Sequence, residues 1–138
     1  MGDFQENAAL LRKGYEAMAA GDPGPVVGMF ASDGVLHANV DGPLGGDHRG
    51  HAAIGQFLGN LFEWTGGTLR IDVEDIFADD EHAVVLVRES ARRARDGVAV
   101  DVRETHLCRF ENGLVADFWD IPVLSQKAAH DAFFSETQ

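Results

Sequence analysis

Residues 98–110 read VAVDVRETHLCRF, and this alternation of apolar and polar positions predicts one long β-strand with a buried face and an exposed face. The even-numbered positions are mostly apolar and form the face that we expect to be buried: Val98, Val100, Val102, Glu104, His106, Cys108 and Phe110. Glu104 and His106 interrupt this apolar row. Burying an ionisable group costs several kcal/mol unless the group is paired or hydrogen-bonded. These two residues therefore need partners inside the protein or a function.

Other strands and helices can be placed around this strand. Strands are predicted at residues 35–40, 69–76, 82–93 and 114–121, with glycine-containing turns at 95–97 and 111–113. Helices are predicted at residues 7–20, in a short segment after Pro23, at 51–62 and at 126–134. Helices followed by an antiparallel meander indicate an α+β protein, with the N-terminal helices on the concave face of a cone-shaped, curved antiparallel sheet. We expect one domain over residues 1–138, because no linker or repeat divides the chain.

The charge balance limits the partners of the chain. It has 23 acidic and 11 basic residues and a formal net charge of -12, which disfavours binding to nucleic acid and to anionic membranes. Cys108 is the only cysteine, so no intramolecular disulfide can form. Residues 1–6 lack the basic start of a signal peptide, and no segment reaches the ~18 apolar residues that span a bilayer. We therefore expect a cytoplasmic protein.

Ionisable residues on neighbouring strands are expected to meet Glu104 and His106. Arg88 belongs to a row with Val84, Leu86 and Ser90, and Asp120 belongs to a row with Leu114, Ala116 and Phe118. If the three strands pair in order, these rows converge on one cavity wall and give four candidate catalytic residues: Arg88, Glu104, His106 and Asp120. The alternative interpretation is structural, with Arg88 and Glu104 as a buried ion pair and His106 as a hydrogen-bonded core residue.

Further residues are predicted to contact a bound ligand. They lie on the first strand, on the strands of the meander, or on and beside the helices: Tyr15, His37, Asn39, Trp64, Ser90 and Phe118. A plain polar edge for His37 and Asn39, and a core or interface position for Trp64, are the alternatives. The six histidines offer no pair with a familiar ligand spacing, so neither a metal nor a cofactor is expected.

Four segments carry a family resemblance. They are YEAMAAGD at residues 15–22, FASDGVLH at 30–37, GDHRGHAAI at 46–54 and RFENGLV at 109–115. In order and spacing they resemble the nuclear-transport-factor-2-like superfamily, and within it the SnoaL-like polyketide cyclases and ketosteroid-isomerase relatives. The resemblance extends over nearly the whole chain. It implies a cystatin-like α+β barrel with a pocket for a small, apolar organic ligand.

The resemblance to ketosteroid isomerases is incomplete at the residues that act in those enzymes. His106 falls where they keep the protonated aspartic acid of their oxyanion hole. Their aspartate base aligns with Ala38, and their tyrosine donor aligns with Gly14. Steroid isomerisation by the same set of residues is therefore not expected.

Two other branches of the superfamily agree on Asp120. It matches the water-activating aspartate of limonene-epoxide-hydrolase-like members and the acid–base aspartate on the last strand of SnoaL-like cyclases. Arg88 matches the arginine between the two epoxide-hydrolase aspartates, whereas Ser90 stands where the second aspartate would be. The resemblance thus implies a proton-transfer role for Asp120.

The preferred hypothesis is an enzyme without a cofactor, namely a lyase, isomerase or cyclase that uses acid–base catalysis on an apolar carbonyl or polyketide-like substrate. Asp120 would move the proton, His106 would polarise the carbonyl oxygen, and Arg88 with Glu104 would hold both in place. The alternatives are a non-catalytic ligand-binding or dimerisation module of the same fold and an epoxide-hydrolase-like hydrolase.

A homodimer is also expected. Relatives commonly pair through the open face of the sheet. The outward-facing residues of the long strand would lie on this face. Their mixture is more apolar than a solvated face requires: Arg103, Thr105, Leu107 and, from the last strand, Trp119.

Overall fold

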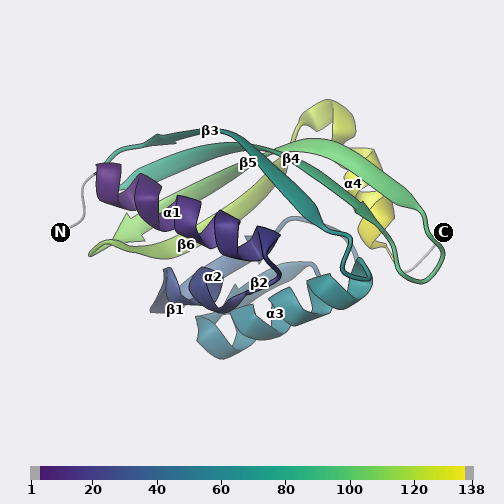
Figure 1. Cartoon of the computed structure of the whole chain (residues 1–138), viewed down its shortest axis with the longest axis horizontal. Coiled ribbons are helices and arrows are strands. Elements are labelled where there is room, and N and C mark those ends of the chain that lie inside the picture. Colours follow the sequence, from purple (N-terminus) through teal and green to yellow (C-terminus); the bar gives the residue numbers. More distant parts are fainter. Residues whose placement is uncertain (1–3, 136–138) are drawn as a thin grey trace.

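A computed structural model describes residues 4–135 of the protein (Figure 1). Residues 1–3, which belong to the segment used above to judge the absence of a signal peptide, lie outside this range. The elements in chain order are α1 (Phe4–Ala19), α2 (Gly24–Gly28), β1 (Phe30–Ala38), β2 (Gly46–Arg49), α3 (Gly50–Trp64), β3 (Arg70–Ala78), β4 (His82–Arg92), β5 (Ala99–Glu111), β6 (Leu114–Pro122), a 3-10 helix (Leu124–Gln126) and α4 (Lys127–Phe134). The predicted α+β class is confirmed.

The six strands form one curved sheet in the order β2-β1-β6-β5-β4-β3. Strands β3 to β6 are antiparallel as predicted, but β1 pairs with β6 in parallel. Parallel pairing needs a long connection, which α3 and the intervening strands supply here. The short strand β2, which the sequence did not predict, pairs with β1 at one edge. The sheet therefore stays open between β2 and β3 and does not close into a full barrel.

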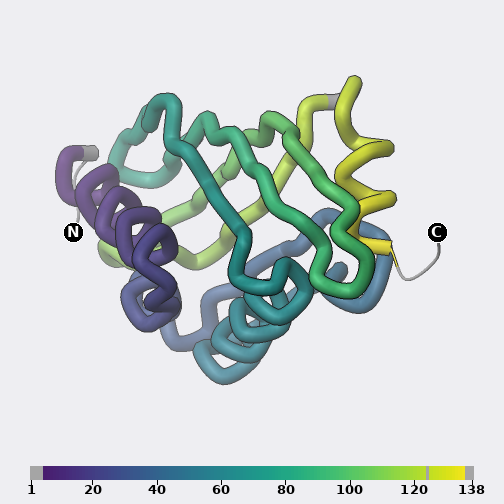
Figure 2. The backbone as a smooth tube through the Cα atoms, turned by 45° about the vertical axis from the view of Figure 1, so that its right-hand side comes forward, coloured from purple at the N-terminus to yellow at the C-terminus, as the bar shows by residue number. Residues whose placement is uncertain are grey.

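Helices cover the concave side of this sheet (Figures 1 and 2). Figure 2 shows α1 at one end of the long strands and α4 at the other, with α3 beneath them. The apolar stripe of α3 places Ile54, Leu58 and Leu61 at intervals of three to four residues, and all three are buried. Leu11 of α1 is also completely buried. The space between these helices and the sheet holds the cavity described below.

The loop between β4 and β5 decides which β4 side chains point inward. It contains four residues, 94–97, because the N–H of Arg93 donates to the carbonyl of Val98 at 2.8 Å. With an even number of loop residues, even-numbered positions of β5 pair with odd-numbered positions of β4, as Glu104 does with Val87. The three-residue turn assumed from the sequence would give the opposite parity, which reverses every side chain of β4.

A β-bulge in the next hairpin restores the pairing of even-numbered residues of β5 with even-numbered residues of β6. Asn112 and Gly113 have positive φ angles of 51° and 78° and form a two-residue turn, which by itself would place β5 and β6 in opposite parity. Ala116 is an extra residue in β6, since Val115 and Asp117 pair with adjacent residues of β5. After this bulge Asp120 pairs with His106, so the prediction that these two residues share one face is confirmed.

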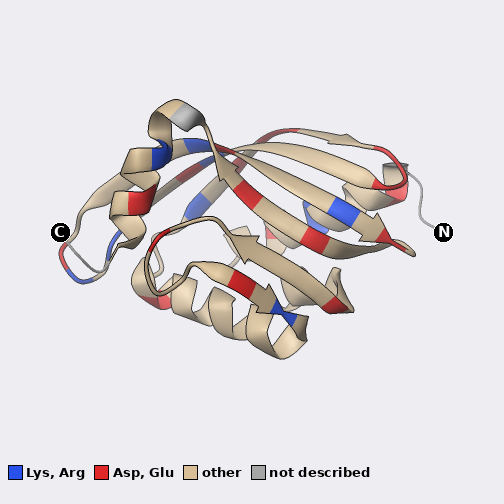
Figure 3. Ribbon diagram, turned by 180° about the vertical axis from the view of Figure 1, so that it is seen from behind, with Lys and Arg blue, Asp and Glu red and all other residues tan. Residues whose placement is uncertain are grey.

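Many charged residues lie on the outside of the molecule, whereas Glu89, Arg93 and Glu104 are buried. Figure 3 shows acidic positions along the strands, the loops and α4, with basic positions between them. Several of them form ion pairs, among them Arg109 with Asp117 and Arg103 with Glu74. Within residues 4–135, no helix combines the length and the apolar character needed to cross a bilayer.

Two glycines give a matched test of the packing against α4. Gly42 has a φ of 109°, and a Cβ added there would collide with the carbonyl oxygen of Phe134 at the end of α4. Gly59 lies inside α3 with nothing within 4 Å of an added Cβ. We expect Gly42→Ala to lower the free energy of unfolding by about 1–3 kcal/mol, and Gly59→Ala to raise it by about 0.4–1 kcal/mol. Urea denaturation measures both, and a Gly42→Ala variant as stable as the wild type would contradict the described packing.

Candidate active site

An apolar cavity of about 90 Å³ lies between the concave face of the sheet and the helices. Aliphatic, thioether and aromatic side chains form most of its lining, including Met18, Met29, Leu36, Phe57, Leu58 and Phe118. Polar side chains also reach it: Tyr15, Glu89, Glu104, His106, Asp120 and His130. An apolar lining with a few convergent polar groups is typical of small-molecule sites.

A chain of hydrogen bonds connects α1 to β5. The hydroxyl of Tyr15 lies 2.6 Å from Nδ1 of His106, and Nε2 of His106 lies 3.2 Å from Oε1 of Glu104. Neutral His106 accepts a hydrogen bond from the Tyr15 hydroxyl at Nδ1, whereas the imidazolium donates to the Tyr15 oxygen and leaves the hydroxyl proton for a ligand. Burial lowers the pKa of His106, but Glu104 outweighs this effect and the pKa is raised. Burial is also the main cause that raises the pKa of Tyr15, which therefore stays a neutral phenol.

Asp120 lies across from His106 and lines the same cavity. The backbone N–H of Asn39 donates to Oδ1 of Asp120 at 2.7 Å. Burial, reinforced by the negative charge of Glu104, raises the pKa of Asp120 to about 6. A carboxyl group with this pKa is mostly ionised at neutral pH and exchanges its proton readily, which suits general acid–base catalysis.

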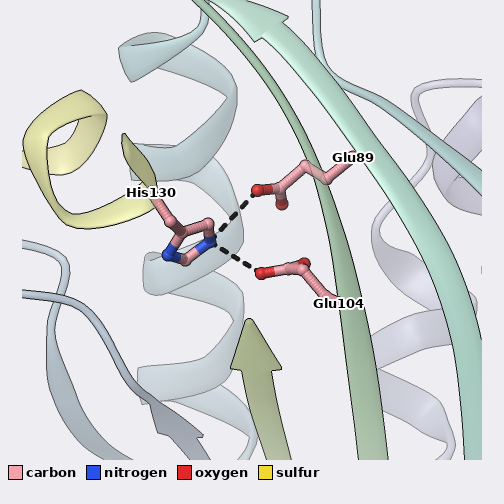
Figure 4. A group of neighbouring side chains, drawn as sticks. All are labelled: Glu89, Glu104 and His130. Atoms are coloured by element: carbon pink, nitrogen blue, oxygen red, sulfur yellow. Dashed lines mark ion pairs between the residues drawn. The ribbon is translucent and has the colours of Figure 1, made fainter. Parts of the chain in front are cut away.

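Two residues that the sequence analysis missed complete the polar wall. Glu89 of β4 and His130 of α4 are buried, and Nε2 of His130 lies 3.2 Å from Oε1 of Glu89 and 2.7 Å from Oε2 of Glu104 (Figure 4). Burial opposes the charge on His130, but the two carboxylates outweigh it and raise the pKa to about 10. Burial likewise opposes ionisation of Glu104, but His106 and His130 lower its pKa to about 2.

The two missed residues differ in how far the sequence could have revealed them. Glu89 continues the apolar row Ala83, Val85 and Val87 of β4, so an odd-numbered buried face would have pointed to it. His130 carries no comparable signal, because only the packing of α4 against the sheet brings it to Glu104.

The prediction that Arg88 points into the cavity is wrong. Arg88 lies on the outer face of the sheet and forms a bidentate ion pair with Asp101, with N–O distances of 2.7 and 2.8 Å. Its side chain is 53% exposed. Ser90 shares this outer parity and does not line the cavity. The physical reason is the four-residue loop after β4, which turns Glu89 inward instead.

The absence of Arg88 from the cavity has two consequences. No arginine within residues 4–135 lines the cavity, so these residues do not supply the arginine of an epoxide-hydrolase-like site. An arginine beside Asp120 would lower the pKa of its carboxyl group. Without that charge, burial raises it.

Only some of the residues predicted to contact a ligand line the cavity. Tyr15 and Phe118 line the cavity. Asn39 takes part only through its backbone N–H. His37 does not line the cavity but lies between two aspartates, 2.8 and 2.7 Å away. Trp64 is also absent from the lining, and its indole N–H donates to a backbone carbonyl of α4 at 3.1 Å.

The curved open sheet, the covering helices and the cavity between them define a protein of the NTF2-like α+β class. The sequence profile of the SnoaL-like domain matches residues 11–118, and the chain belongs to this family. The resemblance found in the sequence is thereby confirmed. The matched region includes Tyr15, Glu104 and His106 and ends just before Asp120. No curated protein sequence matches the chain.

Several solved structures share this fold. Bal32a from a soil-derived mobile gene cassette is 27% identical, with a TM-score of 0.85 over 94% of this chain and 97% of that chain. TerC, co-crystallised with polyporic acid, is 20% identical, with a TM-score of 0.79 over 94% and 99%. A protein from Jannaschia sp. CCS1 described as a SnoaL-like polyketide cyclase is 16% identical, with a TM-score of 0.76 over 98% and 95%.

Replacing Asp120 by asparagine tests the cost of its buried charge. Its pKa of about 6 in the folded protein exceeds the ordinary 3.8, so the protonated group favours folding below 3.8 and this contribution is lost as the pH rises through about 6. Asparagine keeps the shape and the acceptor for Asn39 without a charge. In thermal unfolding, Asp120→Asn should have a higher Tm than the wild type at about pH 7.5, and the difference should shrink towards about pH 4.5. Equal destabilisation at both pH values would contradict the assigned environment.

Proposed function

We propose that this protein is a small-molecule enzyme, an isomerase, cyclase or lyase that moves a proton on an apolar carbonyl or polyketide-like substrate. The observation that carries the proposal is the pairing of Asp120 with His106 on one wall of an otherwise apolar cavity. Membership of the SnoaL-like family supports it. So does the similarity to a structure described as a SnoaL-like polyketide cyclase and to one containing polyporic acid.

The first step assigned to the site is proton abstraction. The Asp120 carboxylate takes a proton from the carbon next to the substrate carbonyl, and the electron pair of that C–H bond moves towards the carbonyl oxygen. The negative charge that develops on this oxygen needs hydrogen-bond donors in a site that excludes water. Tyr15 is placed to donate when Nδ1 of His106 donates to the Tyr15 oxygen, because the phenolic proton is then free.

The second step returns the proton. Protonated Asp120 gives it to another carbon in an isomerisation, or the carbanion forms a new C–C bond in a cyclisation and Asp120 protonates the product. Glu104 does not contact the reacting atoms. It fixes the orientation of His106 through Nε2 and stabilises its positive charge, which makes it a positioning residue.

The lining of the cavity limits the substrate. Met18, Phe57 and Phe118 offer no hydrogen bonds, so the body of the ligand has to be apolar. Its oxygen atoms have to lie towards Tyr15 and Asp120. A largely apolar molecule with a carbonyl group at one end meets both conditions.

Turnover of the Asp120→Asn variant tests the mechanism. Loss of the proton acceptor should lower turnover by about two to four orders of magnitude, while ligand binding in a fluorescence or calorimetric assay stays within about tenfold of the wild type. The turnover of the wild type should rise with pH through an apparent pKa of about 6, because the base has to be ionised.

Arg88→Gln is the matched control for this experiment, since its side chain lies outside the cavity and should leave turnover at the wild-type level. Full turnover by Asp120→Asn would exclude Asp120 from the reaction. A ligand that binds tightly and is never converted by the wild type would instead identify a non-catalytic binding module.

We also propose that the outer face of the sheet joins two copies of the chain. The side chains of Leu86 and Ile121 are 37% and 41% exposed. Both residues are cross-strand neighbours of Thr105 in β5, Leu86 on the side of β4 and Ile121 on the side of β6. Next to this row, Leu107 of β5 pairs with Trp119 of β6. These residues form one continuous, largely apolar surface, which is typical of an interface.

Sedimentation velocity tests the dimer. The wild type should sediment as a dimer at micromolar concentration, and Leu107→Arg should shift it to a monomer, because an unpaired charge would be buried at the interface. A monomeric wild type under these conditions would refute the proposed interface.

A further inference from the structure

His130 turns one ring nitrogen towards two carboxylates. Its Nε2 lies 2.7 Å from Oε2 of Glu104 and 3.2 Å from Oε1 of Glu89, and Figure 4 shows both oxygens facing this nitrogen. Neither oxygen has a hydrogen-bond partner among the described residues, and Nδ1 of His130 has none either. The relative exposures are only 6% for Glu89, 2% for Glu104 and 1% for His130. Three buried polar atoms are therefore left without the hydrogen bonds that such atoms normally make.

A second histidine in the same protein shows what an ordinary pairing with two carboxylates looks like. His37 uses Nδ1 for Asp47 at 2.8 Å and Nε2 for Asp117 at 2.7 Å, and both contacts have hydrogen-bond geometry. Each nitrogen of an imidazolium carries one proton, so His37 satisfies both carboxylates. His130 presents two carboxylates to one nitrogen, which carries a single proton, and neither contact has hydrogen-bond geometry.

We propose that Glu89, Glu104 and His130 bind one divalent transition-metal ion, of which Zn²⁺ fits best, on the wall of the cavity. Their ligand atoms lie within 4.8 Å of one another. Bonds of about 2.0–2.2 Å from a shared ion would bring one nitrogen and two oxygens together in this way. A neutral imidazole, two carboxylates and a divalent ion also have no net charge, which removes the cost of holding two buried carboxylates close together.

The surroundings define the kind of ion. One imidazole nitrogen and two carboxylate oxygens suit Zn²⁺, Mn²⁺ or Fe²⁺ rather than a soft ion such as Cu(I). All three residues line the cavity, so a small molecule bound there would lie beside the proposed ion. The other oxygen of Glu104 is held by Nε2 of His106 at 3.2 Å, which orients this ligand.

This site departs from the sequence expectation of no metal, and the reason is topological. The three residues come from β4, β5 and α4, so no short motif links them. Asp120 is not one of the proposed ligands, and metal binding is measured without reference to turnover. Metal binding can therefore be tested, and can fail, independently of the proposed function.

Isothermal titration calorimetry of the full chain, stripped of metal with a chelator, tests the proposal. Zn²⁺ should bind with a stoichiometry of one to one, and Glu89→Gln and His130→Gln should each weaken the affinity by at least about tenfold. The matched control is His37→Gln, which removes a histidine flanked by two carboxylates outside the cavity and should leave the affinity unchanged.

Two further measurements keep the test decisive if a variant folds poorly. Co²⁺ added to the wild type should give the visible absorption bands of a site with nitrogen and oxygen ligands. Zn²⁺ should also raise the Tm of the wild type, by linkage of binding to folding, and at the same concentration should raise that of Glu89→Gln by clearly less. The proposal is overturned if the wild type binds none of Zn²⁺, Mn²⁺ and Co²⁺, or if both variants bind as tightly as the wild type. It is equally overturned if His37→Gln abolishes binding.

Discussion

The pairing of the buried Glu104 carboxylate with two histidines is the interaction on which the rest of the interior depends. One of the carboxylate oxygens faces His106 of the same strand, and the other faces His130 of α4. Through His106 it also reaches Tyr15 of α1, so the two ends of the concave face are connected through one side chain. The charge of Glu104 also raises the pKa of Asp120. An unpaired carboxylate at this depth would be costly, and the surrounding histidines are what make it tolerable.

Two carboxyl groups in one cavity receive different roles from their surroundings. Glu104 lies between two imidazoles, and despite burial its pKa is about 2, so it stays charged at any working pH. Asp120 has a backbone N–H as its hydrogen-bond partner, and burial raises its pKa to about 6. Such a separation of pKa values distinguishes a fixed charge from a group that exchanges protons. The division of labour between the two residues follows from burial and partners rather than from residue type.

The sequence pattern predicted the elements far better than their faces. Alternation located β5, and helical spacing located the buried stripe of α3, because each signal comes from a single segment. The inward face of β4 depends on the number of residues in a loop, and the inward face of β6 depends on the bulge at Ala116. Hydrophobic periodicity does not report either quantity. Asp120 was therefore placed correctly and Arg88 incorrectly by the same argument, and His130 could be found only from the packing of α4.

The four-residue loop after β4 has a consequence for how such a cavity can acquire new chemistry in evolution. From Ala83 to Val87 both rows of β4 are apolar, so either row is fit to face the core. The rows differ at their next members, which are Arg88 on one side and Glu89 on the other. A single codon inserted into or deleted from residues 94–97 would exchange an acidic for a basic group inside the cavity while the core kept its apolar character. A change in loop length can thus replace the inward-facing acidic residue of β4 by a basic one without any substitution inside the cavity.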